Sequence, residues 1–313
     1  AARAARLTID RDLGAALGPV RSPRSAPARS EADAEVVLIM GIPGAGKTRL
    51  ADAYVTRGFA RLNRDERGGA LRALAAELDG LLAGGARRVV LDNTYLTRAA
   101  RSYVIEAAGR HGAQTRCVWL QTPLAQAQVN MVERLLARFG SLPTPEDLRV
   151  AARREPGLLA PTQQMRALRQ LEPPSADEGF ASVEVIEFAR AAASARTGSG
   201  VFVAAAAVDR PGWEQTLAEL HPRGPHLIFD WRPGASPDVL APLAPGMTAR
   251  SVETAVCPHG PGPPRCWCRP PLPGLPLAFA HSHDLDPARC ALIGTSAAHR
   301  TLAASLGARY VDL

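Results

Sequence analysis

The sequence has almost no lysine: Lys47 stands alone among its 313 residues, and all but one of its 37 basic residues (Lys+Arg) are arginine. A composition rich in Ala, Arg, Gly and Pro indicates GC-biased codons that have all but removed lysine, so the position of the remaining one is informative. The sequence also lacks an apolar run near the roughly 18 residues that a membrane span requires. Its start has neither the apolar core nor the small-residue cleavage site of a secretory signal. We therefore expect a cytoplasmic protein that binds no membrane.

Cysteine is also scarce, and five copies are an odd number that argues against a disulfide framework. Three of them, Cys257, Cys266 and Cys268, fall in one short segment with His259. This usage is typical of a metal site in a reducing compartment.

The net charge of +7 is unevenly distributed. Residues 1–30 hold six Arg against Asp10 and Asp12, so the remainder of the chain is only mildly basic. Overall charge alone therefore does not indicate nucleic-acid binding. Residues 1–33 alternate Ala, Arg, Ser and Pro without an apolar period, which predicts a basic flexible arm. Their Arg and Ser content also suits an organellar transit peptide, although their acidic residues do not.

The rest of the chain divides into two units that alternate strands and helices. Hydrophobic residues make up 46% and charged residues 21%, which is typical of globular proteins, and the length suits two domains. We predict a first domain over residues 34–190, a small-residue linker over 191–200 and a second domain over 201–313. Strands separated by helical segments predict the α/β fold class, with a parallel sheet in each domain.

Short apolar runs mark the predicted strands. They cover residues 36–40, 89–91, 117–120 and 183–186 in the first domain, and 201–204, 226–230, 291–294 and 310–312 in the second. Leucines at positions 71, 74, 78 and 81 recur at helical spacing and precede Gly84 and Gly85, which predicts a helix with a C-terminal stop. A Pro-, Gly- and Cys-rich insertion is expected over residues 256–276.

The first predicted strand leads into a glycine-rich segment that fits the P-loop pattern, Gly-Ile-Pro-Gly-Ala-Gly-Lys-Thr at residues 41–48. Its glycines let backbone N–H groups turn around phosphate oxygens, and the helix expected from residue 49 adds positive potential. Lys47 reaches the β- and γ-phosphates, and Thr48 can hold Mg²⁺. Because the single lysine occupies the position that this chemistry requires, we predict ATP binding rather than a structural turn. The glycines concerned are Gly41, Gly44 and Gly46.

Polar residues follow the next two strands, at the edge where parallel strands meet a ligand. Asp65 can accept the proton of an attacking hydroxyl group, although an Asp before a helix is equally often an N-cap. Asp92 and Asn93 end the strand at 89–91 and suit Mg²⁺ binding or positioning. Arg134 and Arg138 lie four residues apart on one face of a predicted helix. They form either a solvated surface or a lid over the transferring phosphoryl group.

These motifs resemble the kinase domain of the polynucleotide 5′-kinases, both the metazoan kinase-phosphatases and the phage enzyme. The resemblance covers about residues 34–190 and rests on the P-loop, on Asn-Arg-Asp at 63–65, on Leu-Asp-Asn-Thr at 91–94 and on the strand at 183–186. It implies a P-loop kinase fold that transfers the γ-phosphoryl group of ATP to the 5′-hydroxyl of DNA or RNA.

By position, the same resemblance implies roles for residues of this chain. Asp65 becomes the general base, and Arg138 with Arg134 become the lid arginines. The phage enzyme has an Arg three residues after its Asp, where this chain has a glycine. Arg64 or Arg67 is then the candidate for binding the acceptor phosphate.

The cysteine-rich segment places four N and S donors on a loop too poor in apolar residues to fold on its own: Cys257, His259, Cys266 and Cys268. Tetrahedral Zn²⁺ would fix such a loop, as in closed structural sites. The alternative is a set of free thiols in a proline-rich loop. The tight clustering of the four donors favours zinc.

The second domain resembles the heptose bisphosphate and histidinol phosphatases of the haloacid dehalogenase superfamily over about residues 199–313. The resemblance implies an Asp nucleophile with a second Asp after the first strand, a Lys after the cysteines and further acids for Mg²⁺. Here the first strand leads into alanines, the Lys position falls at Arg269-Pro-Pro, and Gly-Thr-Ser-Ala-Ala-His stands at 294–299. Asp209 and Asp230 lie nearby but do not restore the set. Without a carboxylate nucleophile no aspartyl-phosphate forms, so we expect a degenerate, zinc-binding pseudophosphatase.

Together these predictions describe a polynucleotide 5′-hydroxyl kinase that uses ATP, Mg²⁺ and Zn²⁺ and binds nucleic-acid 5′-hydroxyl ends. Two alternatives remain open. A kinase of small-molecule hydroxyls would use the same parts around a closed apolar pocket rather than a basic surface. A nucleotide-gated binding or scaffold protein would bind ATP without turnover.

Overall fold

The computed structural model describes residues 34–64, 70–189, 196–221, 223–244 and 252–313. The predicted arm at 1–33, and Asp65 and Arg67 of the predicted acceptor site, lie outside the described residues. Within the described ranges no helix combines the length and the apolar character needed to cross a membrane. The α/β fold class is confirmed, with two five-stranded parallel sheets.

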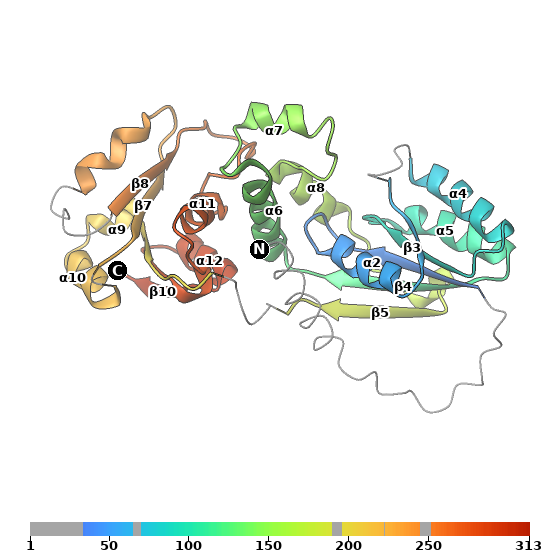
Figure 1. Cartoon of the computed structure of the whole chain (residues 1–313). Coiled ribbons are helices and arrows are strands. Elements are labelled where there is room, and N and C mark those ends of the chain that lie inside the picture. The colour runs from blue at the N-terminus through green and yellow to red at the C-terminus, as the bar shows by residue number, and fades with distance from the viewer. Residues whose placement is uncertain (1–33, 65–69, 190–195, 222, 245–251) are drawn as a thin grey trace.

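The first sheet has the strand order β2-β3-β1-β4-β5 (Figure 1). Its strands are β1 (Glu35–Met40), β2 (Ala60–Leu62), β3 (Arg88–Asp92), β4 (Gln114–Gln121) and β5 (Ser182–Glu187). β1 is buried on both faces, as a central strand of a parallel sheet requires. Its side chains alternate between helix α2 (Lys47–Thr56) on one face and helices α4 (Leu71–Ala83) and α5 (Arg98–Arg110) on the other. Because β1 is also the central strand of the sheet, the loop that follows it lies at the middle of the carboxyl edge.

The predicted leucine helix is confirmed as α4. Leu74, Leu78 and Leu82 are buried on one face of α4, and the helix ends at Gly84. Gly85 follows with a φ of 90°, a left-handed conformation that glycine adopts without strain.

Three helices connect β4 to β5: α6 (Leu124–Phe139), α7 (Pro145–Ala151) and α8 (Pro161–Gln170). A short 3₁₀ turn, η1 (Ala176–Glu178), precedes β5. α7 begins with a capping box in which the side chains of Thr144 and Asp147 bond each other's backbone N–H groups. The connection therefore leaves the sheet at its carboxyl edge, after β4, and re-enters it at the amino edge, where the parallel strand β5 begins.

The second sheet has the order β10-β9-β6-β7-β8. Its strands are β6 (Val201–Ala204), β7 (His226–Trp231), β8 (Val252–Cys257), β9 (Ala291–Gly294) and β10 (Arg309–Asp312). Between them lie helices α9 (Ala205–Val208), α10 (Trp213–Leu220), α11 (Gly274–Ser282) and α12 (Ala297–Leu306), and 3₁₀ turns η2 (Pro237–Leu243) and η3 (Pro287–Arg289). The central position of β6 makes this a doubly wound sheet.

The insertion predicted over 256–276 is shorter than expected. Its first two residues complete strand β8, and its last three begin helix α11. Alternating Val252, Thr254 and Val256 favour a strand there, because β-branched side chains suit an extended backbone. The loop that carries the donors therefore hangs directly from the second sheet.

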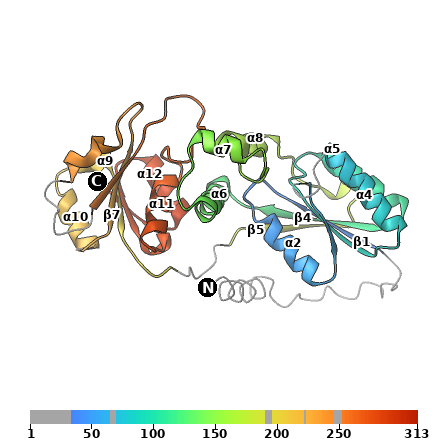
Figure 2. The same ribbon diagram turned by 45° about the horizontal axis from the view of Figure 1, so that its top comes forward.

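Helix α6 lies between the two sheets (Figure 2). Its buried residues Met131 and Leu135 belong to one hydrophobic cluster with Leu277 of α11 and Leu302 of α12. The two parts of the chain therefore share a core through α6, and movement of one part must disturb the other.

Candidate functional site

The P-loop occupies the turn between β1 and α2. Gly44 and Gly46 adopt φ values of 83° and 95°, and a Cβ on Gly44 would lie 2.4 Å from the carbonyl oxygen of Ala127. Lys47 Nζ donates to the carbonyl oxygens of Gly41 and Ile42 at 3.0 Å each. α2 begins at Lys47, so the N–H groups of its first turn and its positive end face the loop. This geometry suits a bound phosphate chain.

Side chains from the β4–β5 connection donate to the carbonyl oxygens of the P-loop. Asn130 Nδ2 lies 2.8 Å from Gly44 O, and the fully buried Gln164 places Nε2 at 2.8 Å from Pro43 O. Thr122 Oγ1 donates to Ala45 O at 3.1 Å. These bonds occupy three consecutive carbonyl oxygens that would otherwise repel a phosphate.

Sequence reasoning missed all three donors. Asn130 had one available signal, because it precedes Arg134 by four residues and so shares its helix face. Nothing in the sequence near Thr122 or Gln164 points to the P-loop.

The strand ends next to the P-loop bring several predicted residues together. Asp92 is 1% exposed, and its Oδ2 lies 2.6 Å from Arg61 Nη2. Asn63 Nδ2 donates to Asp92 O at 2.8 Å and to Asp92 Oδ2 at 3.1 Å. The backbone N–H of Arg64 donates to Asn93 Oδ1 at 3.0 Å. The Asn-Arg-Asp segment therefore starts from a fixed position beside β3, and the Mg²⁺ role predicted for Asp92 stays a prediction.

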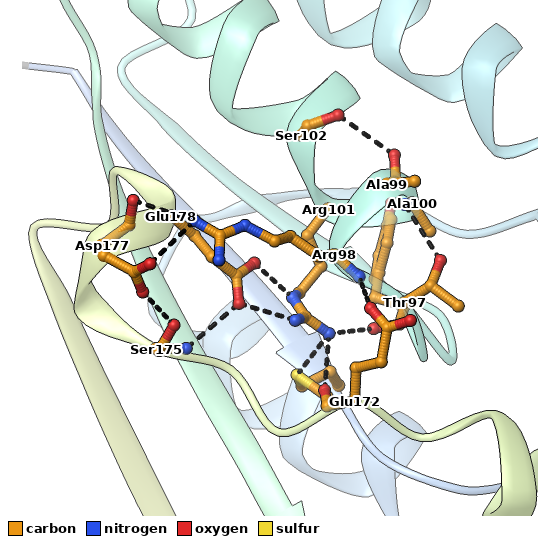
Figure 3. Close-up of polar contacts among 12 residues, drawn as sticks. Thr97, Arg98, Ala99, Ala100, Arg101, Ser102, Glu172, Ser175, Asp177 and Glu178 are labelled. Atoms are coloured by element: carbon orange, nitrogen blue, oxygen red, sulfur yellow. Dashed lines mark hydrogen bonds and ion pairs between the residues drawn. The ribbon is translucent and has the colours of Figure 1, made fainter.

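A buried arginine on α5 organises the neighbouring loops (Figure 3). Arg101 is fully buried and pairs with Glu178 through Nη2–Oε1 at 2.6 Å and Nε–Oε2 at 2.7 Å. Its Nη1 donates to the carbonyl oxygens of Tyr95, Leu96 and Glu172. Burial would raise the pKa of Glu178, but hydrogen bonds from Arg101 and from the backbone outweigh it and lower that pKa. The pair joins the loop after β3 to the segment before β5.

The two predicted lid arginines lie in the C-terminal half of α6. Arg134 Nη1 donates to Gly157 O at 3.3 Å, and Arg138 binds both carboxylate oxygens of Glu155, with Nη2–Oε1 at 2.8 Å. The hydrogen bonds to Glu155 raise the pKa of Arg138. Arg134 stands one turn, about 6 Å, beyond Asn130 on the same face of the helix. Arg134 is therefore nearer to the P-loop than Arg138, and the lid role of both stays a prediction.

A pocket of about 520 Å³ opens beside the P-loop, between the ends of β4 and β5 and helix α8. Its lining is mostly apolar and includes Ile42, Leu120, Leu124, Leu171 and Phe188. Because β4 and β5 lie on the opposite side of β1 from β2 and β3, this pocket is separated from the Asn63–Asp92 cluster by the P-loop. A flat apolar group attached to a phosphate chain fits such a place. Sequence reasoning missed this pocket, whose lining comes from segments far apart in the chain.

The four predicted metal donors come together at the end of β8. The donor atoms of Cys257, His259, Cys266 and Cys268 all lie within 4.8 Å of one another. Sγ of Cys257 is 3.6 Å from Sγ of Cys266 and 3.5 Å from Nδ1 of His259, and Sγ of Cys268 is 3.3 Å from the same Nδ1. The three thiols share hydrogen bonds, which lower the pKa of Cys266 and raise the pKa values of Cys257 and Cys268.

The spacing of these donors fits a tetrahedral zinc ion. Bond lengths of about 2.3 Å to sulfur and 2.0–2.1 Å to nitrogen place tetrahedral donors about 3.5–3.8 Å apart. Two further contacts support the loop, because Trp231 Nε1 donates to the carbonyl oxygen of His259 at 2.7 Å and Arg269 stacks on the Trp231 ring. Arg269 also donates to the carbonyl oxygens of Gly260 and Gly262 and so holds the loop closed.

The carboxyl edge of the second sheet presents few side chains that could take part in a reaction. β6 leads directly into the alanines of α9, and Asp230 at the end of β7 is paired with Arg232 at 2.6 Å. At the end of β9, His299 Nδ1 accepts from the N–H of Thr295 at 3.2 Å, and burial lowers the pKa of His299. Within the described residues this edge therefore offers no free carboxylate at the end of its central strand.

Comparison with known proteins agrees with the geometry of the first part. Residues 36–156 match the family model described as "AAA domain". A curated relative, the bifunctional polynucleotide phosphatase/kinase of Schizosaccharomyces pombe, is 32% identical over 103 residues. That match covers 33% of this chain and 25% of the relative, so the chain spans about a quarter of the relative's length.

Solved structures with partial similarity include several kinases. A sugar kinase from Janibacter sp. HTCC2649 matches with a TM-score of 0.35 at 19% identity, over 49% of this chain and 85% of that one. A gluconokinase from Sinorhizobium meliloti 1021 matches with a TM-score of 0.34 at 17% identity, over 52% and 86% of the two chains. These similarities are too low to bear on the substrate. The family match, the P-loop and the parallel strand order together support a P-loop domain of the kinase type in the first part of the chain.

Proposed function

We propose that this chain transfers the γ-phosphoryl group of ATP to the 5′-hydroxyl of a polynucleotide. The observation that carries the proposal is the juxtaposition of the P-loop with the fixed start of the Asn-Arg-Asp segment. The N–H of Arg64 is held by Asn93, the residue after β3, and β3 pairs directly with the P-loop strand β1. The 32% identity to a polynucleotide phosphatase/kinase over 103 residues supports the choice of acceptor.

The donor nucleotide binds across the carboxyl edge of the first sheet. Its phosphates lie along the P-loop, where the N–H groups at the start of α2 and the ammonium group of Lys47 face them. To reach a phosphate, Lys47 exchanges its bonds to the Gly41 and Ile42 carbonyl oxygens for the stronger attraction of the anion. The base occupies the apolar pocket next to Ile42. Mg²⁺, held by Thr48, would neutralise charge on the β- and γ-phosphates.

The acceptor binds on the β2–β3 side of the P-loop. Asp65, one residue past Arg64, removes the proton of the attacking hydroxyl group. Arg64 and Arg67 contact the phosphates of the acceptor strand. Arg61 neutralises the buried Asp92 carboxylate and Asn63 donates a hydrogen bond to it, so Asp92 adds no net negative charge that would repel the acceptor phosphates.

Arginines of α6 stabilise the negative charge that develops on the phosphoryl group during transfer. Arg134 and Arg138 are held at exposed positions by Gly157 and Glu155, and exposed ion pairs exchange partners at little cost. Either guanidinium can therefore turn to the transferring group once ATP and the acceptor are bound. Such contacts, made mainly in the transition state, raise kcat rather than affinity.

The second part of the chain acts as an inactive, zinc-binding pseudophosphatase. Its doubly wound strand order places a ligand crevice at the carboxyl edge between β6 and β9, where the order of strands reverses. That crevice is bordered by Ala205 and Thr295 instead of acids, so no nucleophile is available. The four donors at 257–268 would hold Zn²⁺ as a structural ion.

A transfer assay tests the proposed reaction. The full chain is incubated with ATP labelled on the γ-phosphate and with 5′-hydroxyl DNA, 5′-hydroxyl RNA or small alcohols, including sugars. We expect label on the oligonucleotides, abolished in Lys47→Ala and retained in Arg57→Ala, which removes a positive charge from the far end of the same helix. Label on sugars alone would replace the polynucleotide acceptor with a small molecule. ATP binding without transfer to any acceptor would leave a nucleotide-gated binding protein.

A further inference from the structure

A tryptophan in the loop that carries the metal donors forms a hydrogen bond to the proposed kinase part of the chain. Trp267, which stands between Cys266 and Cys268, is 2% exposed, and its Nε1 donates to the carbonyl oxygen of Leu159 at 2.9 Å. Leu158 is buried in the same hydrophobic cluster as Trp267. The loop between β8 and α11, called the metal loop below, thus contacts the segment between α7 and α8, residues 152–160 (Figure 1).

Trp267 is fixed on its own side by the metal loop. Both of its chain neighbours are metal donors, so a bound ion would hold the backbone on either side of it. The N–H of Gly274 donates to Trp267 O at 3.2 Å, and a Cβ on Gly274 would lie 2.3 Å from that oxygen. Only glycine fits at the start of α11 this close to Trp267. The indole therefore projects from a rigid base.

The segment that Trp267 contacts leads to the proposed reaction site in both directions. Toward the N-terminus, Gly157 O accepts from Arg134, and Glu155 binds Arg138. Toward the C-terminus, α8 begins two residues after Leu159, and its Gln164 donates to Pro43 O of the P-loop at 2.8 Å. Segment 152–160 thus contacts the arginines of α6 directly, and it leads into α8, which is hydrogen-bonded to the P-loop.

We propose that Trp267 is a positioning residue for phosphoryl transfer, which holds segment 152–160 in place for the arginines of α6. The inference rests on the proposed kinase function. The metal site then acts on the kinase part by fixing Trp267, because the loop around it has few apolar residues of its own. The second part of the chain contributes rigidity to the reaction site instead of a second reaction.

The test uses Trp267→Phe in the full chain, which keeps an aromatic ring and both neighbouring donors but removes the indole N–H. The matched control is Trp213→Phe, at another buried tryptophan of the second part, which packs in a separate hydrophobic cluster with Leu217 and Ile228. Hydrogen–deuterium exchange is followed at amides that bond within or beside the segment, namely Glu155 to Ala151 O, Leu158 to Glu155 O and Gln163 to Ala160 O. Zinc content is measured for every sample.

We expect Trp267→Phe to speed exchange at residues 155–163 about fivefold, the effect of one net hydrogen bond, with no change in α4 or α5. Its kcat should fall by a similar factor, while KM for ATP changes less. Chelation of zinc from the wild type should reproduce the exchange pattern, and Trp213→Phe should not. Equal exchange at 155–163 in the two variants would overturn the inference, whether or not the chain transfers phosphate. Loss of zinc from the wild type with no change in that segment would overturn the role of the metal.

Discussion

Replacing Arg101 by Met should destabilise the kinase part strongly, because Arg101 is a buried cation with one buried counter-ion. Arg101 has no exposed surface, and the side chain of Glu178 is 2% exposed. The substitution keeps an apolar chain of similar length but leaves the Glu178 carboxylate buried without its two arginine bonds. Three backbone carbonyl oxygens, those of Tyr95, Leu96 and Glu172, lose a donor as well.

The expected loss follows from the cost of an uncompensated buried charge. Removing one partner of a buried ion pair costs about 3–5 kcal/mol in the free energy of unfolding. Arg98 offers a matched control on the same helix. It pairs with Asp177 in the same segment, but the two side chains are 54% and 68% exposed. Arg98→Met should change stability little, because solvent screens an exposed pair.

Urea unfolding followed by circular dichroism measures both variants. The double variant Arg101→Met with Glu178→Met should recover much of the loss, since it buries no charge. A free energy of unfolding for Arg101→Met equal to that of Arg98→Met would refute the reasoning.

Unfolding at low pH provides a second check. The pKa of Glu178 is lowered from 4.5, so its contribution is present above that pH and is lost as the pH falls through the folded value. The gap between the wild type and Glu178→Gln should therefore narrow in acid.

Three further predictions concern the proposed catalytic residues, the hydrogen bond from Asn130 to the P-loop, and the candidate metal donors. Lys47→Ala should abolish transfer and weaken ATP binding, whereas Asp65→Asn should abolish transfer alone, because a base meets only the acceptor hydroxyl; calorimetry with ATP separates the two. Asn130→Ala should weaken ATP binding about fivefold, since the Gly44 carbonyl loses a donor at 2.8 Å, as the same titration would show. Cys266→Ser should reduce the zinc content found by elemental analysis and lower the melting temperature without removing ATP binding.

Each of these has an outcome that contradicts it. Turnover near the wild-type rate in Asp65→Asn would remove Asp65 as the base. Unchanged ATP affinity in Asn130→Ala would mean that its bond to the P-loop does not help bind phosphate, and Asn63→Ala, on the acceptor side, provides the comparison. Wild-type protein without zinc would leave the four donors as free thiols.

The parts of the fold that the sequence predicts are those specified by local patterns. A strand buried on both faces reads as a continuous apolar run, so β1 and β6 are found to within one residue. The P-loop is found because its glycines and lysine are contiguous. The metal donors are found for the same reason, since all four fall within 12 residues of chain from 257 to 268.

The parts that sequence reasoning misses depend on contacts between distant segments. Thr122 and Gln164 bond P-loop carbonyl oxygens across separations of 77 and 121 residues, and neither belongs to a local motif. Arg101 lies on α5, whose sequence is typical of a solvent-exposed helix. Its side chain is nevertheless the largest fully buried one among the described residues. Strand β8 was missed because its sequence alternates polar and apolar residues next to a proline-rich loop. Such residues acquire their roles only from the order of strands in the sheets.

The shared core around α6 bears on what the second part of the chain contributes under the proposal that it is an inactive pseudophosphatase. A domain retained for catalysis needs its acids at the carboxyl edge of β6, and those are absent. A domain retained for mechanical support needs instead a large apolar contact and a rigid surface. The cluster that joins α6 to α11 and α12 supplies the contact, and the metal loop with Trp267 supplies the surface. Loss of the acids leaves both intact, because none of the residues that make these contacts is an acid. A second part that serves the proposed kinase through these contacts therefore needs the core and the metal loop but needs no acids at the end of β6.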